Sequence, residues 1–186
     1  MTGPAAPRDL GSLPGAALAA LGYAALYHVN AAVFDGPLRM SDHISWVFLP
    51  AAVRMVAVLL VGWVGVLGLF AGTLITLGSM LGSDLPHALM LATLSSVPPL
   101  LAARSLQRLL PVRADLDGMT GRQLLYFGLG GAAASSLAHT AYFALRAGSL
   151  GPLDGLVPMF GGDTAGTVLV LYLAALMLRH RQLRPR

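Results

Sequence analysis

Long apolar runs separated by short polar breaks dominate this chain. The runs cover about residues 13–34, 46–80, 87–110, 124–145 and 157–178. The breaks between them are rich in Gly, Pro, Asp and Arg, and Gly and Pro are residue types that interrupt helices. A helix needs about 20 mainly apolar residues to cross a hydrocarbon core of roughly 30 Å. All the runs except 46–80 have about that length, so each predicts one transmembrane helix.

The run over 46–80 is too long for one crossing. As a single helix its roughly 35 residues would extend roughly 52 Å, at 1.5 Å per residue. We expect it to fold back at Gly62-Trp63-Val64-Gly65, where glycines relax the backbone and Trp suits the membrane interface. The two spans are then about 46–61 and 64–80. The predicted fold is an all-α polytopic membrane helix bundle of about six transmembrane helices, forming one domain over residues 1–186.

Composition also indicates a lipid environment. Of the 186 residues, 56% are hydrophobic and 11% are charged, whereas soluble domains carry about 25% charged residues. The 12 basic residues are all Arg and lie mostly near predicted helix ends. They therefore indicate membrane topology, and no nucleic-acid partner is expected. The chain has no cysteine, which excludes disulfides and thiolate metal sites.

The distribution of Arg predicts the orientation. With six spans, both termini and the loop before residue 124 share one side of the membrane, and that side carries nine Arg. The other side carries Arg39 and Arg146, while Arg54 lies within a span. Because cytoplasmic segments carry the excess of basic residues, both termini should be cytoplasmic. The expected location is the bacterial cytoplasmic (inner) membrane, as a multi-pass protein.

Several strongly polar side chains fall inside the predicted spans. Helix lengths place them at similar depth in the outer half of the membrane: His28, Asn30, Arg54, His139, Asp163 and Thr164. A charge in a span costs about 2.5–3.5 kcal/mol on insertion scales, so its presence requires a partner or a function. Arg54 and Asp163 are the opposite charges within spans at matching depth. We predict that they pair, directly or through His139 or His28.

This cluster has more than one interpretation. It can form an outward-facing polar pocket for a small anionic or zwitterionic ligand. It can also be a buried ion pair that fixes helix register and binds nothing, or part of a proton or ion pathway. A metal site is disfavoured, because the histidines lie on separate helices without a carboxylate motif. Walker A and His-Glu-x-x-His motifs are missing, so an enzyme is the least favoured class, and no cofactor is expected.

Two stretches resemble a known family. Ser-Trp-Val-Phe-Leu-Pro-Ala-Ala-Val-Arg at 45–54 precedes Gly62-Trp63 and the Gly-Leu-Phe-Ala-Gly of 68–72. Later, Met-Phe-Gly-Gly-Asp-Thr-Ala-Gly occupies 159–166. These elements resemble the first membrane-associated sensor family (MASE1) of bacterial integral membrane domains, especially its short stand-alone relatives. The residues that match the family's elements are Pro50, Arg54, Asp163 and Gly166.

The resemblance implies a signal-sensing, ligand-responsive membrane module. Sensors of that family usually have more spans and are usually fused to a kinase or cyclic-dinucleotide output domain, whereas this chain ends eight residues after Leu178. It is therefore expected to signal through a separate cytoplasmic output protein. The output protein is expected to bind the Arg-rich segment at 104–122 or the C-terminal tail of this chain.

Two further readings remain. Substrate-binding subunits of energy-coupling-factor vitamin importers are similar in length and span count, and they dock a transporter subunit through an Ala-xxx-Ala element such as Ala16-xxx-Ala20 or Ala20-xxx-Ala24 here. Alternatively, the chain is a membrane scaffold with a purely structural ion pair. We interpret its small-residue spacings, including Gly68-xxx-Gly72 and Gly78-xxx-Gly82, as helix packing within one bundle rather than a dimer interface.

Overall fold

The chain forms a set of packed helices with one short hairpin. The computed structural model describes residues 13–34, 36, 38–41, 44–110, 118–148 and 154–182. Its helices are α1 (Leu13–Phe34), α2 (Pro50–Val61), α3 (Trp63–Thr76), α4 (Gly78–Ser83), α5 (Leu85–Leu109), α6 (Gly121–Ala147) and α7 (Leu156–Gln182). Strands β1 (Arg39–Ser41) and β2 (Ile44–Ser45) pair antiparallel between α1 and α2. The all-α prediction is therefore correct apart from this hairpin, which lies partly in the predicted polar break.

The helices differ in their ability to cross a membrane alone. By length and composition, α1, α5 and the Leu156–Met177 part of α7 are long and apolar enough. The apolar helices α2 and α3 are shorter, with 12 and 14 residues. Six spans and cytoplasmic termini thus stay predictions. Much of the Arg-rich loop, at 111–117, and the last four residues lie outside the described part of the chain.

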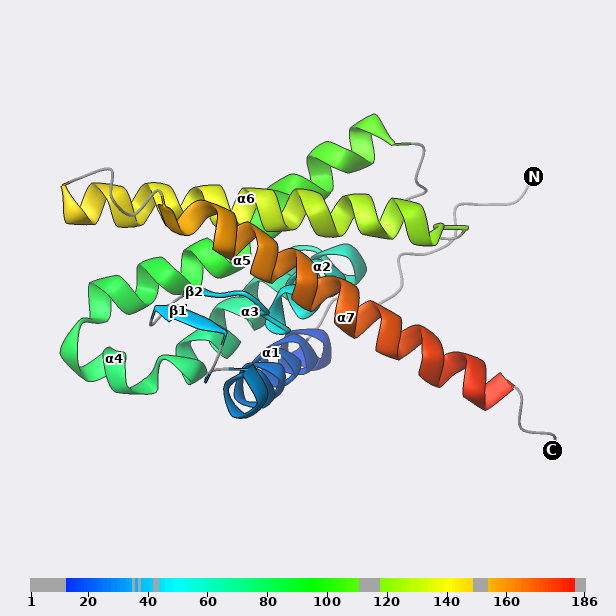
Figure 1. Cartoon of the computed structure of the whole chain (residues 1–186), viewed down its shortest axis with the longest axis horizontal. Coiled ribbons are helices and arrows are strands. Elements are labelled where there is room, and N and C mark those ends of the chain that lie inside the picture. Colours follow the sequence, from blue (N-terminus) through cyan, green and yellow to red (C-terminus); the bar gives the residue numbers. More distant parts are fainter. Residues whose placement is uncertain are drawn as a thin grey trace.

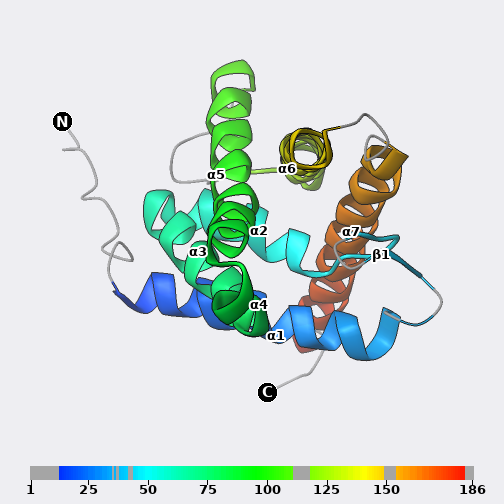
Figure 2. The same cartoon turned by 90° about the vertical axis from the view of Figure 1, so that its left-hand side faces the viewer.

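Helices α1 and α6 lie on opposite sides of the structure, with α2 and α3 between them (Figures 1 and 2). The two views also show that α1 crosses the direction of α6 at a large angle. Hydrophobic side chains of α1, α2, α3, α5 and α6 form the core, and the fully buried ones include Leu69, Leu100 and Phe127. Helix α2 is the most enclosed element, because eight of its 12 residues are buried.

The long apolar run folds back where the sequence predicts. Helix α2 ends at Val61, and α3 begins at Trp63. Gly62 between them has a φ of 56°, a positive value that favours glycine. The predicted bounds at the far ends are wrong. Residues 46–49 are not helical, and the helical run expected over 64–80 is interrupted at Leu77 before α4.

Residues 45–49 pack along the start of α7 instead of forming a helix. The backbone N–H of Phe48 donates to the carbonyl of Gly162 at 3.0 Å. A side chain on Gly162 would overlap the carbonyl oxygen of Ser45, and one on Gly166 would overlap that of Phe48. Because both glycines lack a Cβ, backbone approaches backbone here. This tertiary contact, rather than local propensity, excludes the expected helical start at Trp46.

Small residues also join α1 to α3. A side chain on Gly68 would overlap the backbone of Ala16, and one on Gly72 would overlap that of Ala20, so α3 runs parallel to α1. The interpretation of Gly68-xxx-Gly72 as packing within the bundle is confirmed. Ala16 and Ala20 are used in the same contact, inside this chain. Among the described residues, a side chain added at Gly78 or Gly82 would meet nothing within 4 Å, so the structure does not show the helix packing expected from this second spacing.

Helices α5 and α6 form an antiparallel pair with well-defined ends. Asp84 accepts a hydrogen bond from the His87 N–H and so caps α5, which continues through Pro98 and Pro99. Thr120 and Gln123 form a capping box at the start of α6. These caps explain why the two helices begin two to three residues before the predicted spans at 87–110 and 124–145.

Candidate functional site

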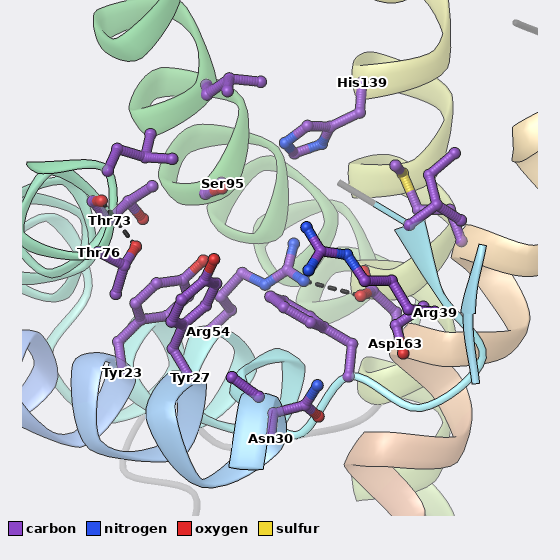
Figure 3. A pocket seen from close by; sticks show the side chains of 17 residues that line it. Tyr23, Tyr27, Asn30, Arg39, Arg54, Thr73, Thr76, Ser95, His139 and Asp163 are labelled. Carbon is purple, nitrogen blue, oxygen red and sulfur yellow. Dashed lines mark hydrogen bonds and ion pairs between the residues drawn. The ribbon is translucent and has the colours of Figure 1, made fainter. Parts of the chain in front are cut away.

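A polar cavity lies where α2 begins and α3 ends (Figure 3). Its volume is about 100 Å³, whereas a single water needs only about 10–15 Å³. Polar side chains line it from α1 (Tyr23, Tyr27, Asn30), the hairpin (Arg39, Ser45), α2 (Arg54), α3 (Thr73, Thr76), α5 (Ser95), α6 (His139) and α7 (Asp163). Every long element of the described chain thus contributes a polar group to one cavity.

A buried ion pair forms the floor of this cavity. Nη2 of Arg54 donates to Oδ1 of Asp163 at 2.7 Å, and the two side chains are only 6% and 4% exposed. The ring of Phe48 lies under the guanidinium, 5.0 Å from its carbon. The predicted pairing of Arg54 with Asp163 is confirmed, and it is direct, without His139 or His28 between them.

The ion pair leaves part of Arg54 unsatisfied. Nε of Arg54 is buried and has no hydrogen-bond partner in the described structure. A guanidinium carries five N–H donors, and one of them is used by Asp163. Since unsatisfied buried donors are costly, this site is suited to a bound molecule or water that supplies acceptors.

Asn30 joins α1 to the start of α2. Its Oδ1 accepts a hydrogen bond from the backbone N–H of Leu49 at 2.9 Å, just before α2 begins at Pro50. Leu49 provides no side-chain cap of its own. A side chain from another helix therefore satisfies a backbone donor at this helix start, and Arg54 follows about one turn later.

Two threonines face the cavity from the last turns of α3. Oγ1 of Thr73 donates to the carbonyl of Leu69 at 2.8 Å, and Oγ1 of Thr76 donates to the carbonyl of Thr73 at 2.8 Å. Both hydroxyl hydrogens are consequently used within the helix. Their remaining lone pairs can accept hydrogen bonds from the cavity.

His139 lines the opposite side of the cavity, on α6. Its Nδ1 lies 2.9 Å from the carbonyl oxygen of Ser135, and because a carbonyl only accepts, Nδ1 carries the hydrogen. In the neutral ring, Nε2 is then the nitrogen that can accept a hydrogen bond. Its place on the cavity wall agrees with its selection as a candidate residue.

The other two candidate residues do not reach the cavity. His28 is exposed on α1, where its ring contacts Tyr27. Thr164 lies beside Asp163, but its Oγ1 is buried without a partner in the described structure and does not line the cavity. Ligand binding by either residue stays a prediction without geometric support.

Some polar residues that line the cavity were not among the predicted site residues. Tyr23 and Tyr27 reach it from the α1 face that also carries Asn30, and Arg39 reaches it from the hairpin. The spacing of Tyr23, Tyr27 and Asn30, four and then three residues apart, places them on one helix face and could have revealed them. No sequence spacing indicated Arg39, because it lies in a predicted polar break and reaches the cavity only through the folded position of the hairpin.

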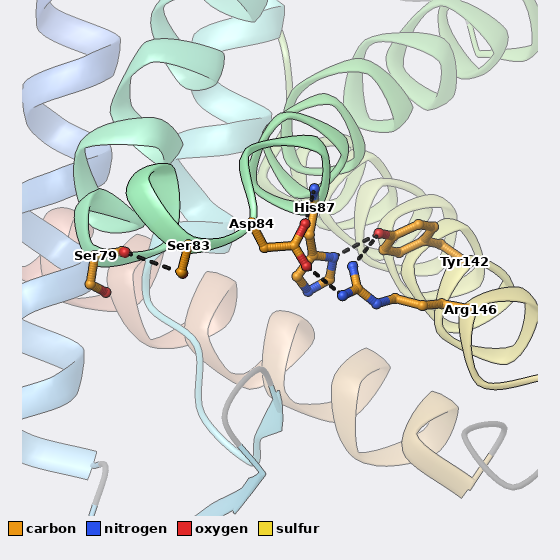
Figure 4. A network of polar contacts seen from close by, with 6 residues as sticks. All are labelled: Ser79, Ser83, Asp84, His87, Tyr142 and Arg146. Atoms are coloured by element: carbon orange, nitrogen blue, oxygen red, sulfur yellow. Dashed lines mark hydrogen bonds and ion pairs between the residues drawn. The ribbon is translucent and has the colours of Figure 1, made fainter.

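A second polar cluster lies outside the cavity, between α5 and α6 (Figure 4). Arg146 donates to Asp84 at 2.5 Å and to the hydroxyl of Tyr142 at 3.2 Å. The same hydroxyl lies 2.7 Å from Nδ1 of His87, and the two rings stack. The hydrogen bond from Arg146 lowers the pKa of Asp84 below its ordinary value, aided by the His87 N–H. This cluster fastens two helix ends together.

Comparisons with known proteins point to one family. The MASE1 family model matches residues 15–186, nearly the whole chain. Neither curated proteins nor solved structures give a significant match. The match includes both stretches that contain the ion pair, the elements around Arg54 and Asp163. This chain therefore belongs to the MASE1 family of membrane-associated sensory domains.

Proposed function

We propose that this chain is a sensory module that binds a small anionic or zwitterionic ligand in the cavity around Arg54 and Asp163. The observation that carries the proposal is the cavity itself, which is several times larger than a water site and has a buried guanidinium with unused donors. A purely structural ion pair would require neither the space nor the unsatisfied nitrogen. Membership of a sensory family gives the ligand a role as a signal.

The proposed topology has six crossings, with the cavity opening to the outer face and both termini in the cytoplasm. Its support is the relative sense of paired helices, since α3 runs parallel to α1 and α5 runs antiparallel to α6, whereas α1 crosses the direction of α6 at a large angle. The excess of Arg on the predicted inner side supports it as well. Non-helical backbone at membrane depth, such as residues 46–49, is tolerated where protein groups satisfy it, as when the Phe48 N–H donates to Gly162 and the Leu49 N–H to Asn30.

Helix α7 is the element best placed to carry a signal inward. Asp163 lies near its start, while the side chains of residues 172–177 are all exposed. Figure 1 shows this half of α7 extending away from the other helices. A ligand that changes the position of Asp163 would act on a helix whose far half has few contacts to restrain it. We propose that this half faces a separate output protein.

Thermal melting in lipid nanodiscs tests the ligand site. The probes are glycine, acetate, succinate and inorganic phosphate, with choline as a cationic control. At least one anionic or zwitterionic probe should raise the Tm of the parent, because a ligand stabilises the state that binds it. Arg54→Gln should abolish the shift, whereas Arg104→Gln, which removes an Arg stacked on Trp63, should retain it. No shift with any probe, or a shift retained by Arg54→Gln, would refute the proposal.

Cysteine labelling tests the topology. Since the parent has no cysteine, Ser83→Cys and Leu109→Cys each introduce one exposed thiol at an opposite end of the α4–α5 segment. A membrane-impermeant maleimide added to intact cells should label position 83 and leave position 109 unlabelled. Labelling of position 109 alone would reverse the proposed orientation.

A further inference from the structure

The α3 wall of the cavity offers hydrogen-bond acceptors. The hydroxyl hydrogens of Thr73 and Thr76 are both donated to carbonyls of α3, at 2.8 Å each. A hydroxyl has one hydrogen and two lone pairs, so each oxygen can now only accept. Both residues line the cavity, and Thr73 is 3% exposed. A ligand group next to this wall must therefore carry N–H or O–H hydrogens.

The α2 wall offers mainly donors. The guanidinium of Arg54 has no acceptor atom, and one of its nitrogens donates to Asp163. Asn30 lines the cavity from α1, and its Oδ1 already accepts from Leu49 while its amide nitrogen retains two hydrogens. Planar carboxylates fit guanidinium donors well. A ligand group next to this wall must therefore supply acceptor oxygens.

Aromatic rings lie between the two walls. Figure 3 shows Tyr23 and Tyr27 between Thr76 and the guanidinium of Arg54, with their hydroxyls directed into the cavity. A tyrosine oxygen can accept a hydrogen bond, as the two threonine oxygens can, so a positively charged donor near Thr73 and Thr76 would meet several acceptors.

We propose, resting on the ligand site proposed above, that the ligand is a compact amino-acid-like zwitterion. Its carboxylate binds the guanidinium of Arg54, and its ammonium group binds the threonine oxygens at the end of α3. The zwitterion is thus oriented across the cavity, with its carboxylate next to the donors of α2 and its ammonium group next to the acceptors of α3. A carboxylate without an ammonium group would leave the acceptors of Thr73 and Thr76 unused.

Matched pairs of probes test this assignment by calorimetric titration in nanodiscs at pH 7. Glycine, β-alanine and 4-aminobutyrate are compared with acetate, propionate and butyrate, which have the same carbon chains without the ammonium group. At least one amino acid should bind about tenfold or more tightly than its matched carboxylate. Thr76→Val, which keeps the side-chain shape, should reduce that ratio about tenfold, the size of one lost hydrogen bond near 1.4 kcal/mol.

Thr93→Val is the matched control. Thr93 donates to the carbonyl of Leu89 at 2.8 Å in the same manner, but it is exposed on α5 away from the cavity. Its substitution should leave the ratio unchanged, and melting temperatures should show that both variants fold.

The outcomes separate this inference from the proposed function. Equal binding of the amino acid and the matched carboxylate in all three pairs would overturn the zwitterion while the ligand site survives. Selectivity that persists in Thr73→Val and Thr76→Val would also overturn it, because the ammonium group would then bind elsewhere, for example at Asp163. Absence of binding by all six probes would overturn the zwitterion too. The proposed function would be refuted as well only if succinate and phosphate also left the Tm of the parent unchanged.

Discussion

Arg54 and Asp163 lie 109 positions apart in sequence, yet a hydrogen bond of 2.7 Å joins them in the interior. Removing one partner would leave the other charge buried and uncompensated. We expect Arg54→Ala and Asp163→Asn each to lower the free energy of unfolding by about 3–5 kcal/mol, because each leaves a buried charge without its partner. Thermal melting in detergent measures the effect.

Exchanging the two residues should partly restore stability, because the pair is retained with its charges reversed. The exposed pair of Asp84 and Arg146 provides the comparison, since its side chains are 36% and 46% exposed. Loss of that pair should change melting far less. Single variants of Arg54 and Asp163 that melt like the parent would contradict an energetic role for the pair.

Gly166→Ala should destabilise the protein, because the added methyl group would overlap the carbonyl oxygen of Phe48. Overpacking of this kind costs about 1–3 kcal/mol. The control is Gly161→Ala on the same helix, where the methyl group would meet only Trp46, at 3.7 Å. Because Ala favours helix over Gly, that variant should be neutral or stabilising. Equal Tm values for the two variants would argue against the close contact.

Asn30→Ala should loosen the start of α2. It removes the acceptor for the buried N–H of Leu49, with an expected cost of about 1–3 kcal/mol. Hydrogen exchange of a peptide covering residues 47–55 should become faster. His28→Ala, two residues earlier on the exposed face of α1, should leave both exchange and melting unchanged. Slow exchange in Asn30→Ala would show that Leu49 has another acceptor.

The pair of Asp84 and Arg146 should make a pH-dependent contribution to stability. Folding lowers the pKa of Asp84, so the carboxylate contributes stability above its unfolded pKa of about 3.9 and loses it as the pH falls through its folded pKa. Asp84→Asn retains the helix cap but loses the charge. The Tm difference between the parent and this variant should be largest above about pH 5 and shrink below about pH 4. A constant difference across this range would contradict the expectation.

Much of the fold follows from local patterns along the chain. The first helix occupies the predicted residues 13–34, and Gly62 forms the predicted turn. Arg54 and Asp163 were paired from sequence because two charges in apolar helices at similar depth have few ways to avoid a large desolvation cost. Such inferences depend on periodicity, length and charge, which a sequence displays directly.

Features created by tertiary contact were not predictable in the same way. Residues 46–49 continue the apolar run, so hydrophobicity alone does not distinguish them from helix, and their contact with Gly162 and Gly166 is created by the fold. Pro50 was a usable signal, since proline favours the first turn of a helix. The approach of Arg39 to the cavity depends on the hairpin, which the pattern of polar residues did not reveal.

The contact between Phe48 and Gly162 also bears on how the protein is made. During translation, Gly162 is synthesised more than 100 residues after Phe48. Until then, the backbone N–H of Phe48 lacks the carbonyl to which it donates in the folded protein. Lipid cannot replace that partner, because it offers no hydrogen bonds to an exposed amide. Residues 46–49 can therefore reach their final position only after the start of α7 has been synthesised.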